Sequence, residues 1–218
     1  MAARLVFTHQ TVVQFCCSGV TGVTNTPIGG RGAGGVAVKQ ERLQRTGIGA
    51  QEKAAIVLDR YARDGQRKES EGKEKDIVDC LREAMRVDGP LIETVSGYDF
   101  RTTLFPGVKF ENAPRAPEAL LELLRKEEGA RERILSMTVR YILVVDIEAS
   151  SRRAVYRATV LDAKTRAKAG ELSVDAAGGI GTGLGILSLP ERAACSGLGK
   201  AVHHFILSEE GPAPSKTQ

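Results

Sequence analysis

Two of the four cysteines are placed where they could form a covalent cross-link. Cys80 lies on the apolar stripe of a predicted helix over residues 71–87, and Cys195 lies on that of a predicted helix over residues 190–207. If both helices cover the same side of a sheet, the two thiols meet. A disulfide would close a loop of about 115 residues, stabilise the fold by about 4–5 kcal/mol and require an oxidising compartment. The alternative is two buried free thiols that behave as small hydrophobes.

A glycine-rich segment could cradle a phosphate or contact a partner. It holds Gly178, Gly179, Gly181, Gly183 and Gly185, between a predicted strand and a predicted helix. The Gly-Lys-Ser/Thr ending of a P-loop is missing, and the glycine spacing differs from that of a dinucleotide-binding turn. We therefore interpret the segment as a surface loop that contacts a partner, with nucleotide binding as the alternative.

Neither the paired histidines nor the paired amino-terminal cysteines form a metal-binding motif. His203 and His204 are adjacent on a predicted helix, where their side chains point about 100° apart and cannot chelate one ion as an i, i+4 pair does. Cys16 and Cys17 are adjacent as well, and no second ligand pair stands at zinc-site spacing. The sequence therefore predicts no metal site.

No group of residues has the arrangement of a catalytic site. Ser196 lies inside a predicted helix and lacks the strained turn that exposes a nucleophilic serine. Asp146, Glu148 and Asp162 lie on or beside predicted strands, where carboxylates cap turns or pair with arginines. We expect a protein that is not an enzyme and that uses no cofactor.

The most informative element is a nearly unbroken apolar run over residues 139–147, which is typical of a strand buried on both faces. The surrounding patterns predict an α/β fold of the α+β type. Its mixed β-sheet has about five strands in the order β-α-β-α-β-β-β-α, with residues 139–147 central and helices packed on the sheet. The predicted strands cover residues 54–58, 91–95, 139–147, 154–161 and 169–176, and the predicted helices cover residues 71–87, 96–104, 117–126, 130–137 and 190–207. Ser96 is the predicted N-cap of the second helix.

The chain is divided into an amino-terminal extension, one folded domain and a short tail. Residues 1–50 are rich in glycine and read as a disordered or signal-like extension. Residues 51–207 are predicted to form a single α/β domain, and residues 208–218 a disordered tail. The formal net charge of +4 comes entirely from the extension, so the domain is neutral. A neutral domain without clustered basic and aromatic residues excludes nucleic-acid binding.

Three stretches resemble a group of uncharacterised proteobacterial envelope proteins and lipoproteins. They are an acidic-Phe-Arg helix that ends in Leu-Phe-Pro, a proline-rich turn before an amphipathic helix, and a buried strand that opens with Arg-Tyr, at residues 99–106, 113–120 and 140–145. Cys80-Leu81 and Cys195 also look like that group's pattern. The group usually begins with a lipoprotein signal, whereas here Phe15 precedes Cys16. More distantly, the order of elements is similar to the amino-terminal domain of the Tol-system propeller protein and to the curli-secretion lipoprotein.

These resemblances imply binding in the cell envelope rather than catalysis. We expect a periplasmic or outer-membrane-associated module that binds another envelope protein or a cell-wall component. The contact surface would be the sheet face left uncovered or the glycine-rich segment, and a membrane would be reached only through an amino-terminal anchor. Two alternatives stay open: a cytoplasmic nucleotide-binding protein or enzyme that uses Gly178–Gly185, and a structural subunit of a homo-oligomer.

Overall fold

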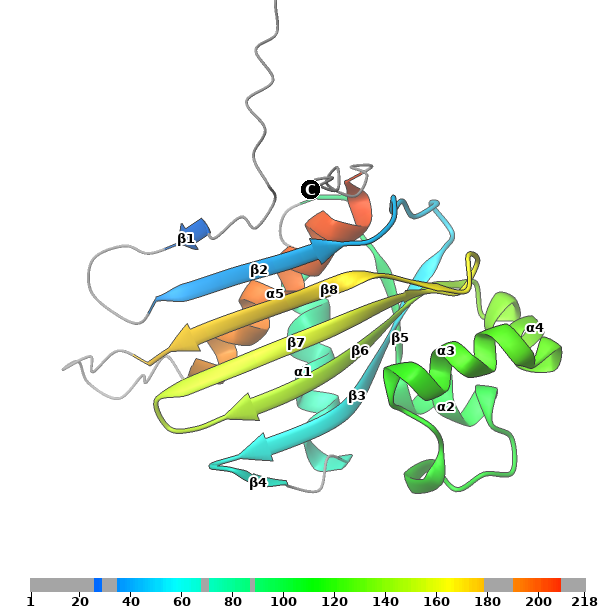
Figure 1. Cartoon of the computed structure of the whole chain (residues 1–218), viewed down its shortest axis with the longest axis horizontal. Coiled ribbons are helices and arrows are strands. Elements are labelled where there is room, and N and C mark those ends of the chain that lie inside the picture. Colours follow the sequence, from blue (N-terminus) through cyan, green and yellow to red (C-terminus); the bar gives the residue numbers. More distant parts are fainter. Residues whose placement is uncertain (1–25, 29–34, 68–70, 87–88, 179–189, 209–218) are drawn as a thin grey trace, which may run out of the picture.

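The computed structural model describes residues 26–28, 35–67, 71–86, 89–178 and 190–208. They form a mixed sheet with helices on both faces, so the predicted α+β class is confirmed (Figure 1). The strands are β1 (Thr26–Ile28), β2 (Val36–Arg42), β3 (Lys53–Arg63), β4 (Gln66–Arg67), β5 (Glu93–Ser96), β6 (Val139–Ala149), β7 (Arg153–Asp162) and β8 (Ala167–Ala177). The helices are α1 (Glu71–Ala84), α2 (Gly97–Leu104), α3 (Pro117–Lys126), α4 (Glu128–Ser136) and α5 (Pro190–Leu207), with a 3-10 turn, η1 (Phe110–Asn112).

The eight strands follow the order β1-β2-β8-β7-β6-β3-β4, and β5 pairs with β3. β3 runs parallel to both β5 and β6, whereas the other neighbours are antiparallel. β3, α1 and β5 therefore form the strand-helix-strand unit that the sequence predicts. The five predicted strands correspond to β3, β5, β6, β7 and β8, and the structure adds β1, β2 and β4.

β6 is buried on both faces, as its apolar run predicts. Tyr141 and Leu143 point toward α1 and α5, whereas Ile142 and Val144 point toward the core under α2, α3 and α4. The strand lies one position from the middle of the sheet order, where the antiparallel half meets the parallel strand β3. A strand in this position needs apolar side chains at consecutive residues, which explains the unbroken run.

The folded domain begins earlier in the chain than residue 51. β2, at residues 36–42, pairs with β8 along its whole length and lies inside the segment assigned to the extension. Val36 and Val38 pack against the core, while Ala37, Lys39 and Glu41 are exposed. This alternation is a strand pattern, so the assignment of all of residues 1–50 to a disordered or signal-like extension is wrong for β2. β3 likewise continues to Arg63, past the end predicted at residue 58.

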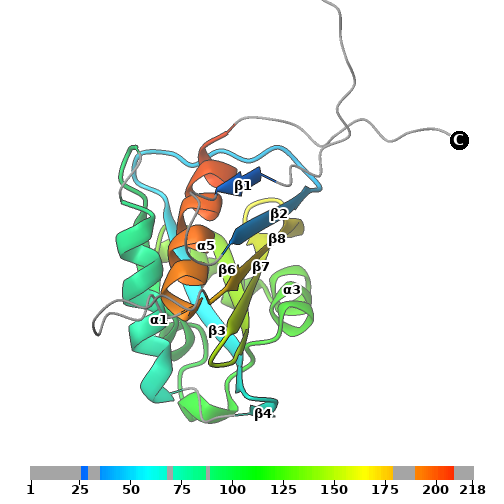
Figure 2. The same ribbon diagram turned by 90° about the vertical axis from the view of Figure 1, so that its left-hand side faces the viewer.

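The helices are divided unequally between the two faces of the sheet (Figure 2). α1 and α5 pack together on one face, over the larger hydrophobic core. α2, α3 and α4 cover the other face only toward its β3 end, over a smaller core. The rest of that face, over β2, β8, much of β7 and the carboxyl-terminal ends of β3 and β6, is open (Figure 1). No helix in the described ranges is long and apolar enough to cross a membrane.

Close contact between α1 and α5 depends on a glycine. A Cβ atom added at Gly199 of α5 would lie 2.5 Å from the Ala84 Cβ and 3.0 Å from the Leu81 carbonyl oxygen of α1. Both distances are shorter than normal van der Waals contacts, so the helices would have to separate. Gly199 therefore sets how closely these two helices pack.

Replacement of Gly199 by alanine is expected to destabilise the protein by about 1–3 kcal/mol, because overpacking outweighs the gain in helix propensity. Urea unfolding measures the change in the free energy of unfolding. Gly129→Ala in α4 is the matched control, since its Cβ would meet only Arg133 at 3.6 Å. It should be neutral or stabilising by up to about 1 kcal/mol. Equal effects of the two substitutions would contradict the packing argument.

Candidate functional site

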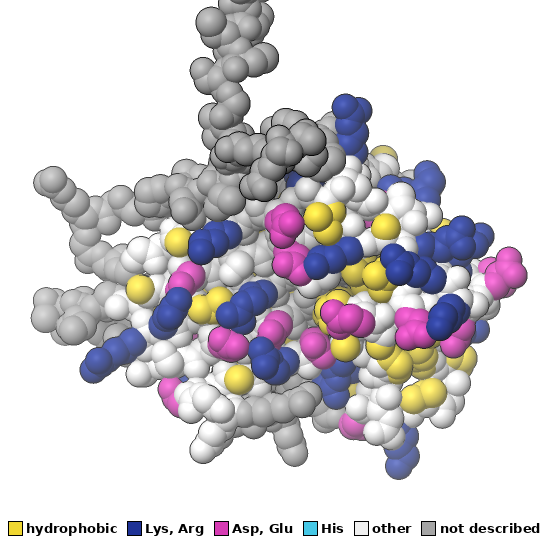
Figure 3. Space-filling view, viewed as in Figure 1, with side chains coloured by type: hydrophobic (Ala, Val, Ile, Leu, Met, Phe, Trp, Pro, Cys, Tyr) yellow, Lys and Arg dark blue, Asp and Glu magenta, His cyan; other side chains and the backbone are white. Residues whose placement is uncertain are grey.

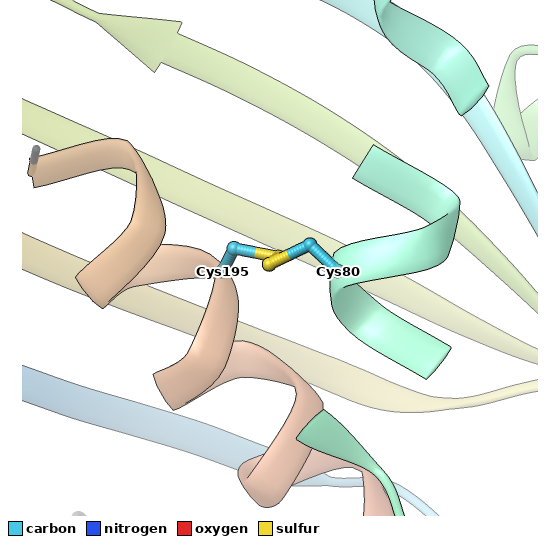
Figure 4. The surroundings of a disulfide bond; sticks show 2 residues. All are labelled: Cys80 and Cys195. Carbon is cyan, nitrogen blue, oxygen red and sulfur yellow. A yellow bond between two sulfur atoms is a disulfide. The ribbon is translucent and has the colours of Figure 1, made fainter. Parts of the chain in front are cut away.

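A disulfide joins the two helices that cover the larger core. Cys80 of α1 and Cys195 of α5 are bonded, with their Cα atoms 6.4 Å apart and 115 residues between them in sequence (Figure 4). The predicted pairing is therefore present, and the alternative of two free thiols is not. The bond also lines a groove of about 780 Å³ between α1 and α5. It ties the beginning of the last helix to the middle of the first.

A buried ion pair between Glu74 and Arg101 connects helices α1 and α2 around the edge of the sheet. Arg101 Nη2 of α2 donates a hydrogen bond to Glu74 Oε2 of α1 at 2.8 Å, and the two side chains are 0% and 7% exposed. Arg101 also donates to the carbonyl oxygens of Gly97 at 3.3 Å and Phe110 at 3.4 Å. α1 and α2 pack on opposite faces of the sheet, so this buried ion pair connects the two helix layers.

Glu74 lies at a gap in the pairing of β3. On the outer side of this strand, β5 pairs with residues 53–56 and β4 with residues 62–63. No other described strand pairs with β3 on this side. Burial raises the pKa of the Glu74 carboxyl, and this effect outweighs the opposing effects of Arg101 and of a hydrogen bond from the Leu58 backbone. Glu74 Oε1 is buried without a hydrogen-bond partner of normal geometry among the described residues.

Only glycine fits against the Glu74 carboxylate at the start of α2. A Cβ atom on Gly97 would overlap Glu74 Oε1 and would approach the Ile56 carbonyl oxygen to 2.8 Å. Ser96 begins the helix, because its hydroxyl accepts a hydrogen bond from the Asp99 backbone N–H at 3.0 Å. The sequence predicts this cap, and the structure confirms it. The cap and the glycine together place the first turn of α2 against Glu74.

Arg101 also supports a pair of aromatic rings. Its guanidinium carbon lies 3.5 Å from the centroid of the Phe110 ring, a cation–π contact. The Phe110 ring in turn lies 5.1 Å from the Tyr98 ring, at an interplanar angle of 43°. Tyr98 is 58% exposed, one of the most exposed large hydrophobic residues among those described. The stack thus runs from a buried cation to an exposed phenol ring.

These residues border a groove that we call the α1–α2 groove. It has a volume of about 690 Å³ and lies between α1 and the first turn of α2, with η1 at one side. Its lining residues are Glu74, Lys75, Val78, Asp79, Arg82, Ser96, Gly97, Tyr98, Asp99, Phe110 and Glu111. Asp79 pairs with Lys75 at 2.7 Å and with Arg82 at 3.3 Å, and Arg82 Nε also donates to the Thr94 hydroxyl. The groove therefore combines aromatic rings with charged groups of both signs.

The open face of the sheet, by contrast, is covered by charges that pair with one another (Figure 3). Charged residues of both signs lie on its strands: Asp59 and Arg60 on β3, Asp146 and Glu148 on β6, Arg153 and Arg157 on β7, Glu171 and Asp175 on β8, and Lys39 and Glu41 on β2. Arg60 binds Asp146 through two hydrogen bonds of 2.9 and 2.8 Å, and Arg157 lies 3.3 Å from Glu148. Arg153 pairs with Asp175. Such cross-strand pairs suit a face in contact with water.

The carboxylates near the strands have the structural partners that the sequence predicts. Asp146 and Glu148 belong to the ion pairs of the open face. Asp162 caps the turn between β7 and β8, since its Oδ1 accepts hydrogen bonds from the backbone N–H groups of Lys164 at 2.8 Å and Thr165 at 3.1 Å. Its other oxygen pairs with Arg140 at 2.9 Å.

The glycine-rich segment lies almost wholly outside the described residues. Of its predicted contact residues only Gly178 is described, and its backbone N–H donates to the Arg152 carbonyl oxygen at 2.6 Å. Gly179, Gly181, Gly183 and Gly185 belong to the part of the chain that is not described.

The two histidines of α5 have different surroundings. His203 is buried, with Nε2 3.0 Å from the Pro90 carbonyl oxygen, whereas His204 is exposed. In the described ranges, no three histidine, cysteine or acidic side chains gather where they could hold a metal ion.

Sequence reasoning missed the Glu74–Arg101 pair and the groove beside it. A usable signal is present: Glu74 stands three and four residues before Ile77 and Val78, on the buried stripe of α1. Arg101 likewise stands between the buried Phe100 and Leu104 on α2. A charged residue at a core position on each of two helices indicates a buried ion pair.

Comparisons with known proteins found few similarities. No protein-family model matches the chain, and no curated protein matches it. Among solved structures, the PelC dodecamer from Paraburkholderia phytofirmans in space group P6 is 12% identical, with a TM-score of 0.46, and the match covers 80% of this chain and 99% of that one. A point variant of the same dodecamer in space group C2 is 13% identical, with a TM-score of 0.45, covering 77% and 98%. At TM-scores below 0.5, such likenesses do not establish a shared function.

Removal of the disulfide is expected to lower the free energy of unfolding by about 4–5 kcal/mol, because the unfolded chain regains the entropy of a long loop. The Cys80→Ala/Cys195→Ala double variant and the oxidised wild type are compared by urea unfolding. The wild type in reducing buffer is the control and should match the double variant closely. A loss below about 1 kcal/mol in both would contradict this contribution.

The pH dependence of stability should reveal the raised pKa of Glu74. Because the folded state holds the Glu74 proton more tightly than the unfolded chain does, stability is lost as pH rises from the ordinary value of 4.5 through the folded pKa. Near pH 4 the protonated carboxyl resembles an amide. Glu74→Gln should therefore gain stability relative to wild type between pH 4 and pH 7, measured by urea unfolding at both values.

Glu122→Gln is the matched control for this titration. Glu122 is an exposed residue of α3 whose pKa is lowered by a hydrogen bond from Lys126. Glu122→Gln should therefore lose a little stability relative to wild type between pH 4 and pH 7, the opposite of what we expect for Glu74→Gln. If wild type instead gains stability relative to Glu74→Gln between pH 4 and pH 7, the attraction by Arg101 outweighs the effect of burial on the pKa of Glu74, and the prediction is wrong.

Proposed function

We propose that the protein is a non-enzymatic binding module of the cell envelope, held in an oxidising compartment outside the cytoplasm. The observation that carries this proposal is the Cys80–Cys195 disulfide. Such cross-links persist in periplasmic and extracellular proteins and are rare in the cytosol, where thiols are kept reduced. The resemblance of residues 99–106, 113–120 and 140–145 to envelope proteins points to the same compartment.

The surroundings of the ionisable groups support a binding role over catalysis. The carboxylates nearest the centre of the sheet, Asp146, Glu148 and Asp162, are engaged by arginines or by a turn. Catalytic carboxylates need a free oxygen that faces the substrate. The α1–α2 groove instead offers exposed aromatic surface beside a rigid pair of charges, which is typical of recognition. Within this proposal, the groove replaces the open sheet face as the preferred contact surface.

The state of the two thiols in native cells tests the proposed compartment. Intact cells that make the full chain are treated with N-ethylmaleimide, and the protein is digested without reduction for mass spectrometry. We expect a linked peptide pair that contains Cys80 and Cys195, and alkylation of both residues only after reduction.

A Cys80→Ala variant made in the same cells serves as the control. Its Cys195 has no partner and should be alkylated once the protein is unfolded in the reagent, which shows that the reagent detects a free thiol at this site. Recovery of wild-type Cys80 and Cys195 as alkylated thiols without reduction would overturn the assignment to an oxidising compartment.

A further inference from the structure

The exposed end of the aromatic stack is held in a fixed position. Tyr98 contacts Phe110, and Phe110 rests on the Arg101 guanidinium, which is itself bound by Glu74 and by the Gly97 carbonyl oxygen. A ring that is already ordered loses little conformational entropy when a ligand stacks on it. Tyr98 therefore presents a flat, preorganised surface at the wall of the α1–α2 groove.

The polar rim of the groove offers hydrogen-bond donors and acceptors side by side. Asp79, Asp99 and Glu111 supply carboxylate acceptors, while Lys75 and Arg82 supply donors. A hydroxyl group both donates and accepts, so a ligand rich in hydroxyls can use both kinds of group at once. A polyanion would meet three carboxylates, and a polycation would meet two cations. The rim therefore favours a neutral ligand.

The volume of the groove and the aromatic ring of Tyr98 limit the class of ligand further. A volume of about 690 Å³ is that of a site for a small organic ligand and exceeds the needs of a single small polar molecule. The face of an aromatic ring is electron-rich and attracts positively polarised hydrogen atoms. The axial C–H groups of a pyranose ring present such atoms on one side, while its hydroxyls point outward toward the rim.

We propose that the α1–α2 groove binds an uncharged oligosaccharide. One pyranose ring stacks on Tyr98, and its hydroxyls form hydrogen bonds with Asp79, Arg82 and Asp99. This assignment rests on the proposed binding role, for which it names the ligand class, and a glycan is a ligand that the cell envelope supplies. Its test has a readout separate from the redox state of the cysteines.

Isothermal titration calorimetry of the full chain tests the assignment with three tetrasaccharides. N-acetylglucosamine tetramer and cellotetraose are neutral, and glucosamine tetramer is cationic. We expect at least one neutral tetramer to bind, with no tighter binding of the cationic one. Tyr98→Ala should weaken the neutral ligand about tenfold, because a stacking contact of this kind is lost. Tyr98→Phe keeps the ring and should change affinity less than about threefold.

Leu135→Ala on α4 is the matched control. Leu135 is 49% exposed and does not belong to the groove lining, so its truncation should leave affinity unchanged. Circular dichroism verifies that each variant is folded. The assignment is overturned if neither neutral tetramer binds at millimolar concentration, if only the cationic tetramer binds, or if Tyr98→Ala and Leu135→Ala have equal effects. If no oligosaccharide binds, the alkylation experiment on Cys80 and Cys195 still tests the proposed compartment. If the two thiols are found free, the titration still tests oligosaccharide binding, so the two proposals can fail separately.

Discussion

The buried ion pair between Glu74 and Arg101 is the interaction on which the arrangement of the two helix layers depends. It crosses the outer edge of β3, where β5 and β4 leave part of the strand without a neighbouring strand. Loss of one partner would leave an uncompensated charge in the interior, at a cost of about 3–5 kcal/mol. The same pair dictates a glycine at position 97 and supports the Phe110 ring. Electrostatics and packing are therefore coupled at this edge of the sheet.

Helix α1 is held to both of its neighbouring helices, and this explains why it can form one wall of a binding groove. The disulfide ties Cys80 to α5, and the close contact at Gly199 holds the same two helices together further along. Glu74, near the beginning of α1, ties it to α2. A helix fixed to both neighbours keeps its exposed side chains, among them Asp79 and Arg82, at a constant distance from the first turn of α2. Such preorganisation lowers the entropic cost of binding.

The open sheet face and the α1–α2 groove both carry paired charges, but the groove also exposes an aromatic ring. On the sheet, arginines of β3 and β7 are matched by carboxylates of β6 and β8 in neighbouring positions. A partner that covered this face would have to desolvate these pairs, and a buried pair returns little net energy. In the groove, an aromatic ring is exposed although it is fixed from below. A ligand that covers the groove also removes this exposed ring from water, which is why the proposed site lies there.

The sequence by itself determined the elements whose signals are local. The unbroken apolar run defines β6, the apolar period defines α5, Ser96 caps α2, and the apolar stripes of two helices carry Cys80 and Cys195, because each pattern lies within one segment of the chain. That the two thiols meet depended on both helices covering the same face of the sheet. The carboxylate partners of the strand ends were predictable for the same reason. Only the tertiary structure decided that β2 joins the sheet, that Glu74 meets Arg101 and that Tyr98 borders a groove. Those features depend on how segments far apart in sequence come together at a sheet edge, and no periodicity within one segment specifies that geometry.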